Sequence, residues 1–190
     1  MKMVAIVFSL LLSSPAFATW AEDFELLKDV PRSYEDSGAI CEEVARIEVE
    51  REYQKPQYEV IVGIAYGNEA RVIGELDIVI FDNNLNKVIK IGEVKCWKDM
   101  RGGLEKAKEQ RARFLKTVRS TANNLRFFST SSKLVYSAEQ FKFVNEFFSM
   151  GQKGTVSVGY DKELEYTLKE MHNYRYEMIR CQNRKECARP

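Results

Sequence analysis

The chain has 190 residues, 45% of them hydrophobic, which is enough for one domain with a core of its own. Its 29 Lys and Arg residues balance 28 Asp and Glu residues, and the formal net charge of +1 excludes both a strongly basic nucleic-acid tail and an acidic disordered protein. A single histidine, His172, excludes zinc sites and acid–base mechanisms that need two histidines.

Residues 1–18 are typical of a secretory signal peptide. Lys2 provides a short positive segment, residues 3–12 form a mostly apolar run, and Ala16 and Ala18 are small residues at positions −3 and −1 of a cleavage site. The apolar run is too short to span a bilayer comfortably, although an uncleaved N-terminal anchor is the alternative. We therefore expect a periplasmic or secreted protein that has no membrane association once the signal peptide is removed.

The mature chain, residues 19–190, contains four cysteines and is expected to form a single domain. In an oxidising compartment an even number of cysteines suggests two disulfides, for which three pairings exist. Cys181 and Cys187 lie close together in a polar tail, so a local bridge between them is the simplest pairing. Cys41 and Cys96 would then tie a helix to the end of a strand, and the crossed pairings stay open.

The first half of the mature chain predicts helices followed by a sheet. A short helix is expected near residues 24–28, and a longer one at 38–53, where Ile40, Val44 and Ile47 recur at helical spacing. Three runs rich in β-branched residues follow, and the short turns between them predict an antiparallel meander. These strands are expected at residues 58–66, 71–81 and 87–97.

The second half predicts helices alternating with short strands. Ser137 and Gln140 form a capping-box pattern, which favours a helix that continues to Met150, and Asp161 is the expected cap of a long last helix. With no internal repeat or linker, one α/β domain is predicted. Its further elements are expected at residues 104–117 (helix), 132–137 (strand), 138–150 (helix), 155–159 (strand) and 161–180 (helix).

Charged residues interrupt the second and third predicted strands. Glu75 and Asp77 are two residues apart and are expected on one face of a strand, as are Glu93 and Lys95. Because the hairpin pairs these strands, three carboxylates and one amine are predicted to converge among apolar neighbours. Charges in such a place cost several kcal/mol unless they are paired or bind a metal.

Clustered carboxylates suit a hard divalent cation, Mg²⁺ or Mn²⁺. Such an ion binds a phosphate oxygen and lowers the pKa of a water molecule, while the amine of Lys95 stabilises charge that develops on the phosphate. This chemistry hydrolyses a phosphodiester without histidine, which agrees with the composition. A buried ion-pair cluster without catalytic function is the structural alternative.

Residues 74–79 (GELDIV) followed by 92–95 (GEVK) resemble the core signature of the PD-(D/E)xK nuclease superfamily. The closest similarity is to its restriction-endonuclease-like and Holliday-junction-resolvase-like branch. The resemblance covers about residues 38–137, which follow the family order of helix, three-stranded meander, helix and strand. It implies an αβββαβ core with a mixed sheet flanked by helices, to which this chain adds a C-terminal helical extension.

The resemblance also implies roles for individual residues. Asp77 and Glu93 match the acidic metal ligands, Lys95 matches the catalytic lysine, and Glu75 matches a frequent acid whose role varies in the family. Many members use a further glutamate on the first helix. Glu43 is expected to take that role, because it shares a face with Ile40 and Ile47, and its neighbour Glu42 is the rival.

The helix at 104–117 is the expected contact with nucleic acid. Gln110 and Phe114 resemble the Q-x-x-x-Y element of nuclease branches, with Phe in place of Tyr. Residues 98–119 are rich in bases, of which Lys106, Arg111 and Arg113 are expected to contact backbone phosphates without recognising sequence. The expected partner is DNA, with RNA left open, and a homodimer is left open as well.

Two functions follow from the sequence. The first is an exported Mg²⁺- or Mn²⁺-dependent deoxyribonuclease, either endo- or exonucleolytic. The alternative is a non-catalytic exported binding module that keeps the nuclease fold. The retention of Asp77, Glu93 and Lys95 together favours the enzyme.

Overall fold

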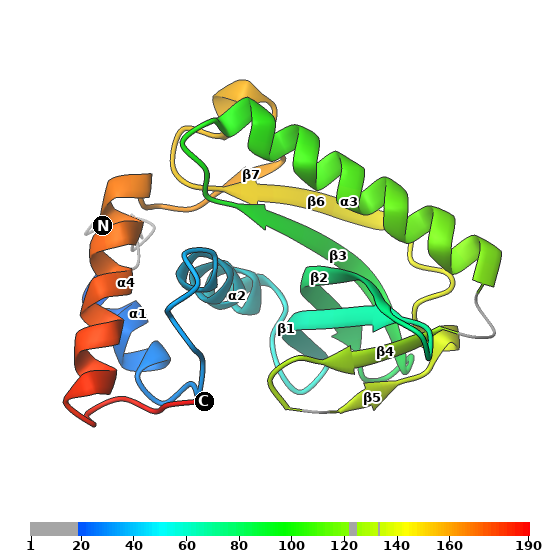
Figure 1. Ribbon diagram of the computed structural model, residues 1–190, viewed down its shortest axis with the longest axis horizontal. Helices are drawn as coiled ribbons and strands as arrows, with labels where there is room; N and C mark the ends of the chain where they lie inside the picture. Colours follow the sequence, from blue (N-terminus) through cyan, green and yellow to red (C-terminus); the bar gives the residue numbers. More distant parts are fainter. Residues whose placement is uncertain (1–18, 122–124, 133) are drawn as a thin grey trace, which may run out of the picture.

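The computed structural model describes residues 19–121, 125–132 and 134–190, so the predicted signal peptide lies outside the described residues. They form an α/β structure around one seven-stranded mixed sheet with the strand order β5-β4-β1-β2-β3-β6-β7 (Figure 1). The strands are β1 (Tyr58–Gly67), β2 (Val72–Asp82), β3 (Lys87–Lys95), β4 (Arg126–Ser129), β5 (Val135–Tyr136), β6 (Glu146–Gly151) and β7 (Lys162–Glu163). The helices are α1 (Trp20–Leu27), α2 (Ala39–Glu52), α3 (Met100–Thr121) and α4 (Leu168–Asn183), with short 3₁₀ helices η2 (Ala138–Gln140) and η3 (Val156–Val158). The predicted α/β class with helices flanking a mixed sheet is confirmed.

The predicted meander of β1, β2 and β3 is present and forms the centre of the sheet. Its strands pair antiparallel, whereas β6 pairs parallel with β3. A parallel partner requires a crossover connection, and the chain makes it through α3 and the β4–β5 edge.

Helices cover both faces of the sheet (Figure 1). On the α2 face, Ile40 and Val44 of α2 pack with Ile78 of β2 and with buried residues of α1 and α4. On the α3 face, Phe114 of α3 packs with Val79 of β2 and with strand and loop aromatics. Strands buried on both faces explain why the meander is almost continuously apolar.

The predicted helix at 138–150 is wrong. Ser137 and Gln140 do form a capping box, but it closes only η2, and the chain then enters β6. Phe147 packs on the α3 face and Phe148 on the α2 face, which is the alternation of a strand. The free edge of β3 provides backbone hydrogen bonds that outweigh the local helical tendency.

Other boundaries also differ from the prediction. Of the strand expected at 132–137, the described part forms only the short β5, and its longer partner β4 was missed. The strand expected at 155–159 is the 3₁₀ helix η3. The last helix begins at Leu168 after the cap Thr167, because Asp161 instead accepts hydrogen bonds from the backbone N and the Oγ of Ser149, at 2.7 and 2.8 Å.

Both expected disulfides are present. Cys41 of α2 is bonded to Cys96, just after β3, with a Cα–Cα distance of 6.3 Å. Cys181 and Cys187 close a local loop after α4, with a Cα–Cα distance of 5.4 Å. Among the described residues, no helix is both long enough and apolar enough to cross a membrane.

Candidate functional site

The candidate site lies where β2 and β3 separate. The two strands pair as far as Ile78 and Gly92 and then diverge. Asp77 Oδ2 accepts a hydrogen bond of 2.8 Å from the backbone N of Val94, so a carboxylate takes the place of a strand partner. We refer to this point, defined by Asp77, Glu93, Val94 and Lys95, as the fork.

The three residues expected to carry the chemistry meet at the fork. Lys95 Nζ lies 2.5 Å from Asp77 Oδ2 and 3.6 Å from Glu93 Oε2, and it also donates to the carbonyl of Val94. Asp77, Glu93 and Lys95 are 6%, 3% and 9% exposed. Val94 packs on the α2 face, so Glu93 and Lys95 project to the α3 side as the alternation predicted.

An irregularity in two neighbouring strands places Asp77 at the fork. Val62 and Ile78 pack on the α2 face, whereas Ile64 and Leu76, two residues away in each strand, pack on the α3 face. Between them Gly63 has a φ of +70°, and a Cβ there would lie 2.4 Å from Thr130 Oγ1. Glycine is therefore required at this position.

Because of this irregularity, the side chains of Glu75 and Asp77 do not follow the regular strand alternation that the sequence predicted. It is exposed at the rim of the site, where its Oε1 lies 3.5 Å from Thr130 Oγ1. Partial burial of its carboxylate, with the negative charge of Asp77 nearby, raises the pKa of Glu75.

Helix α2 contributes Glu42 to the site rather than Glu43. Glu43 is buried, but its Oε2 accepts a hydrogen bond of 2.8 Å from Arg46 Nε, an ion pair within α2. Glu42 lines the same cavity as Lys95 and forms an ion pair with Arg32. Adjacent residues of a helix project in well-separated directions, and α2 is oriented so that Glu42, and not Glu43, faces the fork. The metal-binding role expected for Glu43 does not fit its position.

Helix α3 supplies two of the expected contact residues to the same place. Lys106 and Gln110, one turn apart, line a cavity of about 280 Å³ together with Glu42, Lys95 and Trp97. We refer to it as the fork cavity. Arg113 is exposed farther along α3, and Phe114 belongs to the core.

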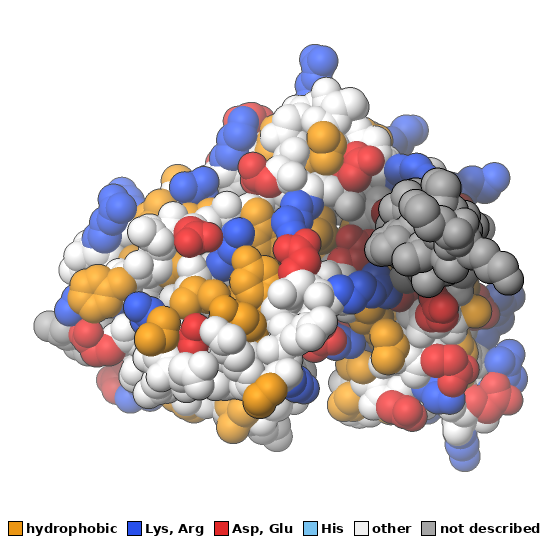
Figure 2. Space-filling model, turned by 180° about the vertical axis from the view of Figure 1, so that it is seen from behind, with side chains coloured by type: hydrophobic (Ala, Val, Ile, Leu, Met, Phe, Trp, Pro, Cys, Tyr) orange, Lys and Arg blue, Asp and Glu red, His pale blue; other side chains and the backbone are white. Residues whose placement is uncertain are grey.

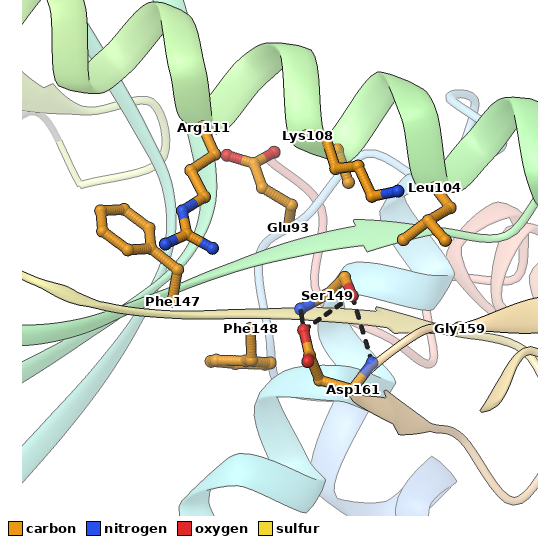
Figure 3. Close-up of a pocket in the computed structure, with 10 residues that line it drawn as sticks. Glu93, Leu104, Lys108, Arg111, Phe147, Phe148, Ser149, Gly159 and Asp161 are labelled. Carbon is orange, nitrogen blue, oxygen red and sulfur yellow. Dashed lines mark hydrogen bonds between the residues drawn. The ribbon is translucent and has the colours of Figure 1, made fainter.

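A second cavity, of about 170 Å³, lies between α3 and β6 (Figure 3). Glu93 lines it together with Lys108, and Arg111 stands over the ring of Phe147 at 4.4 Å. Both carboxylate oxygens of Glu93 are buried without a hydrogen-bond partner. An unsatisfied buried carboxylate is costly, so this side chain is suited to bind a further group.

The site carries more negative than positive charge. Four carboxylates, of Glu42, Glu75, Asp77 and Glu93, surround Lys95 and Arg32. Burial and the charge of Asp77 raise the pKa of both Glu42 and Glu93. Burial lowers the pKa of Lys95, but the charges of Asp77 and Glu93 outweigh it and raise that pKa overall.

With all four carboxyl groups ionised, as a bound cation would favour, the cluster has two more negative than positive charges. Together with the carboxylate oxygens of Glu93, which accept no hydrogen bond from a described residue, this fits a divalent cation in charge and in ligand type. Among the described residues, no group of three or more His, Cys, Asp or Glu side chains is arranged to hold a metal ion. The ammonium of Lys95 instead contacts Asp77 Oδ2 directly.

The sequence interpretation missed Arg32. It lies in the segment between α1 and α2, where no periodic pattern marks it, and it reaches Glu42 only because the chain folds back over the fork. The neighbouring Pro31 indicates a loop but not where that loop leads.

Comparison of the chain with protein-family models, with curated proteins and with solved structures finds no match.

Proposed function

We propose that the protein is an exported, metal-dependent nuclease that hydrolyses phosphodiester bonds of DNA. The observation that carries the proposal is the meeting of Asp77, Glu93 and Lys95 in one buried cluster at the fork. The order of elements along the chain supports it: apart from β4, β5 and η2, which come between α3 and β6, the order α2-β1-β2-β3-α3-β6 agrees with the αβββαβ core of the PD-(D/E)xK nucleases that the motifs resemble. Two disulfides are typical of exported proteins and support that part of the proposal.

Asp77 and Glu93 are the residues that would hold Mg²⁺ or Mn²⁺, with Glu42 as the acid contributed by α2. When bound, the ion supplies a Lewis acid for a phosphate oxygen and lowers the pKa of a water molecule. The backbone N of Val94 fixes one oxygen of Asp77, which orients this carboxylate.

Lys95 would act as a fixed positive charge. Its raised pKa keeps the side chain protonated as an ammonium at neutral pH. Placed in a buried site, an ammonium stabilises the negative charge that develops on the phosphate during hydrolysis. The same side chain offsets part of the acidic charge when no substrate is present, since it bonds Asp77.

The first test is hydrolysis of linear and circular DNA by the mature protein with Mg²⁺ or Mn²⁺, stopped by EDTA. Asp77→Asn and Lys95→Met should each lower the rate at least 100-fold, because a positioned charge contributes about that much or more. The matched control is Glu146→Gln, an exposed acid on β6 that pairs with Lys90 and does not line the fork cavity. Full activity in either fork variant would refute the assigned roles.

The alternative is the non-catalytic binding module. The direct contact between Lys95 and Asp77 favours it, because an ammonium already neutralises one acid. Calorimetric titration with Mn²⁺ separates the two functions. Binding that is lost in Asp77→Asn supports the enzyme, whereas the absence of binding together with the absence of hydrolysis supports the module.

A further inference from the structure

Trp97 occupies an unusual position for a tryptophan. It lies two residues after Lys95, the last residue of β3, and lines the fork cavity while remaining 44% exposed. The chain has two tryptophans, and the other, Trp20, stacks on Tyr174 with ring centroids 4.0 Å apart. Trp97 has no such ring contact among the pairs seen in the described residues.

The backbone of Trp97 is held in place. Gln152 Nε2 donates a hydrogen bond of 2.8 Å to the Trp97 carbonyl, and Gln152 itself is 1% exposed. A buried side chain thus fixes the backbone of Trp97 beside the cavity that its side chain lines.

The rest of the fork cavity combines cationic and amide groups. Lys106 forms only a loose, exposed ion pair with Glu109, at 3.4 Å, which leaves its ammonium available to an anion. Gln110 lines the same cavity, and its buried Oε1 has no hydrogen-bond partner among the described residues. An aromatic face, a weakly paired ammonium and an amide acceptor without a hydrogen bond together suit a nucleotide, which carries a ring, an anion and N–H donors.

We infer that the fork cavity holds one base of an unpaired strand, stacked on Trp97, so that the substrate is single-stranded or locally unpaired nucleic acid. The inference rests on the proposed function for the identity of the ligand as nucleic acid. At about 280 Å³ the cavity has room for one nucleotide-sized group. In a duplex each base is already stacked on both sides, so its face reaches an indole only after the base has left the stack.

Stacking of one base on an aromatic side chain is worth enough to be measured. In general, replacing the stacking aromatic residue by Ala lowers the affinity about 5- to 150-fold. Because the contact uses a ring face that every base presents, little dependence on sequence is expected.

The test measures binding in EDTA, so that no cleavage occurs. In a Trp20→Phe background Trp97 is the sole tryptophan, and its fluorescence reports directly on the cavity. A short oligothymidylate strand should quench it, and a hairpin duplex of the same charge should quench it little. Anisotropy titrations with a dye-labelled strand, which do not need the indole, compare the variants. Trp97→Ala should weaken binding of the single strand about tenfold or more, Trp97→Phe should retain most of the affinity, and duplex binding should change little.

The matched control is Phe143→Ala, which removes an aromatic side chain that is 72% exposed and does not line the fork cavity. It should leave binding of the single strand unchanged. Unaltered affinity of Trp97→Ala for the single strand, or an equal loss for single strand and duplex, overturns the inference. Thermal unfolding of Trp97→Ala and Trp97→Phe shows whether any loss of affinity comes from unfolding.

The two proposals fail separately. Quenching by the single strand without hydrolysis in Mg²⁺ or Mn²⁺ contradicts the enzyme and leaves the binding site in place. Hydrolysis that is indifferent to Trp97 supports the enzyme and contradicts the stacking site.

Discussion

Glu48 is a half-buried carboxyl group on α2 whose protonation links pH to stability. Its Oε1 accepts a hydrogen bond of 3.3 Å from the backbone N of Glu165. Burial outweighs this bond and raises the pKa of Glu48 to about 7, from an ordinary value of 4.5. The folded state therefore binds the proton more tightly than the unfolded state does.

This raised pKa gives a prediction with a defined sign. Since folded Glu48 keeps its proton between about pH 4.5 and 7, its contribution to the free energy of unfolding should fall as the pH rises through that window and level off above it. Glu48→Gln should reduce this slope, as measured by urea unfolding at several pH values. Glu139→Gln, an exposed acid, is the control. A slope in Glu48→Gln equal to that of the parent protein would contradict the prediction.

At the scale of elements, the two disulfides differ in the length of the loop that they close and in the elements that they join. The Cys41–Cys96 bridge closes a loop with a sequence separation of 55 residues, while the Cys181–Cys187 bridge has a separation of 6. Loop-closure entropy makes the longer bridge worth about 4 kcal/mol and the shorter one about 2 kcal/mol. Cys41 directly precedes Glu42, and Cys96 directly follows Lys95, so the longer bridge also holds α2 against the fork.

We therefore expect Cys41→Ser with Cys96→Ser to lower the free energy of unfolding by about 4 kcal/mol and to reduce nuclease activity at temperatures where the variant is still folded. The reason is that carboxylates on both sides of the fork repel each other once the covalent link is lost. Cys181→Ser with Cys187→Ser serves as the control and should cost about 2 kcal/mol with activity retained. Denaturant unfolding and initial rates measure both effects, and equal rates in the two double variants would show that the longer bridge has no influence on the site.

At the scale of the whole molecule, charge is balanced overall and uneven locally. The net charge is +1, and Figure 2 shows acidic and basic side chains interspersed on the face seen there. Long-range attraction of a polyanion is therefore weak, and the proposed binding of nucleic acid would depend on local cations such as Lys106 and Arg111 on α3. These two residues lie on the two cavities that flank Glu93 and Lys95.

The salt dependence of binding tests this distribution. Lys106→Ala with Arg111→Ala should reduce the slope of log affinity against log salt by about 1.4 for a single strand, because each phosphate contact contributes about 0.7. Lys142→Ala, which removes an exposed cation paired with Glu139, should leave the slope unchanged. Anisotropy titrations in EDTA at several salt concentrations measure it. A slope that is the same in all three proteins would place the phosphate contacts elsewhere.

The amino-acid sequence by itself determined the α/β class and the antiparallel meander, because strand alternation and short turns depend on neighbouring residues, and it singled out Asp77, Glu93 and Lys95. The position of Asp77 at the fork depends in addition on the irregularity beside Gly63. Both disulfide pairings were also among its expectations. Only the tertiary structure decided that Glu42 rather than Glu43 faces the fork, that Arg32 joins it, and that residues 146–151 form a strand. These outcomes depend on the rotation of a helix, on a segment that folds back over the sheet, and on a free strand edge. Each of them is set by contacts between parts of the chain that are far apart in sequence.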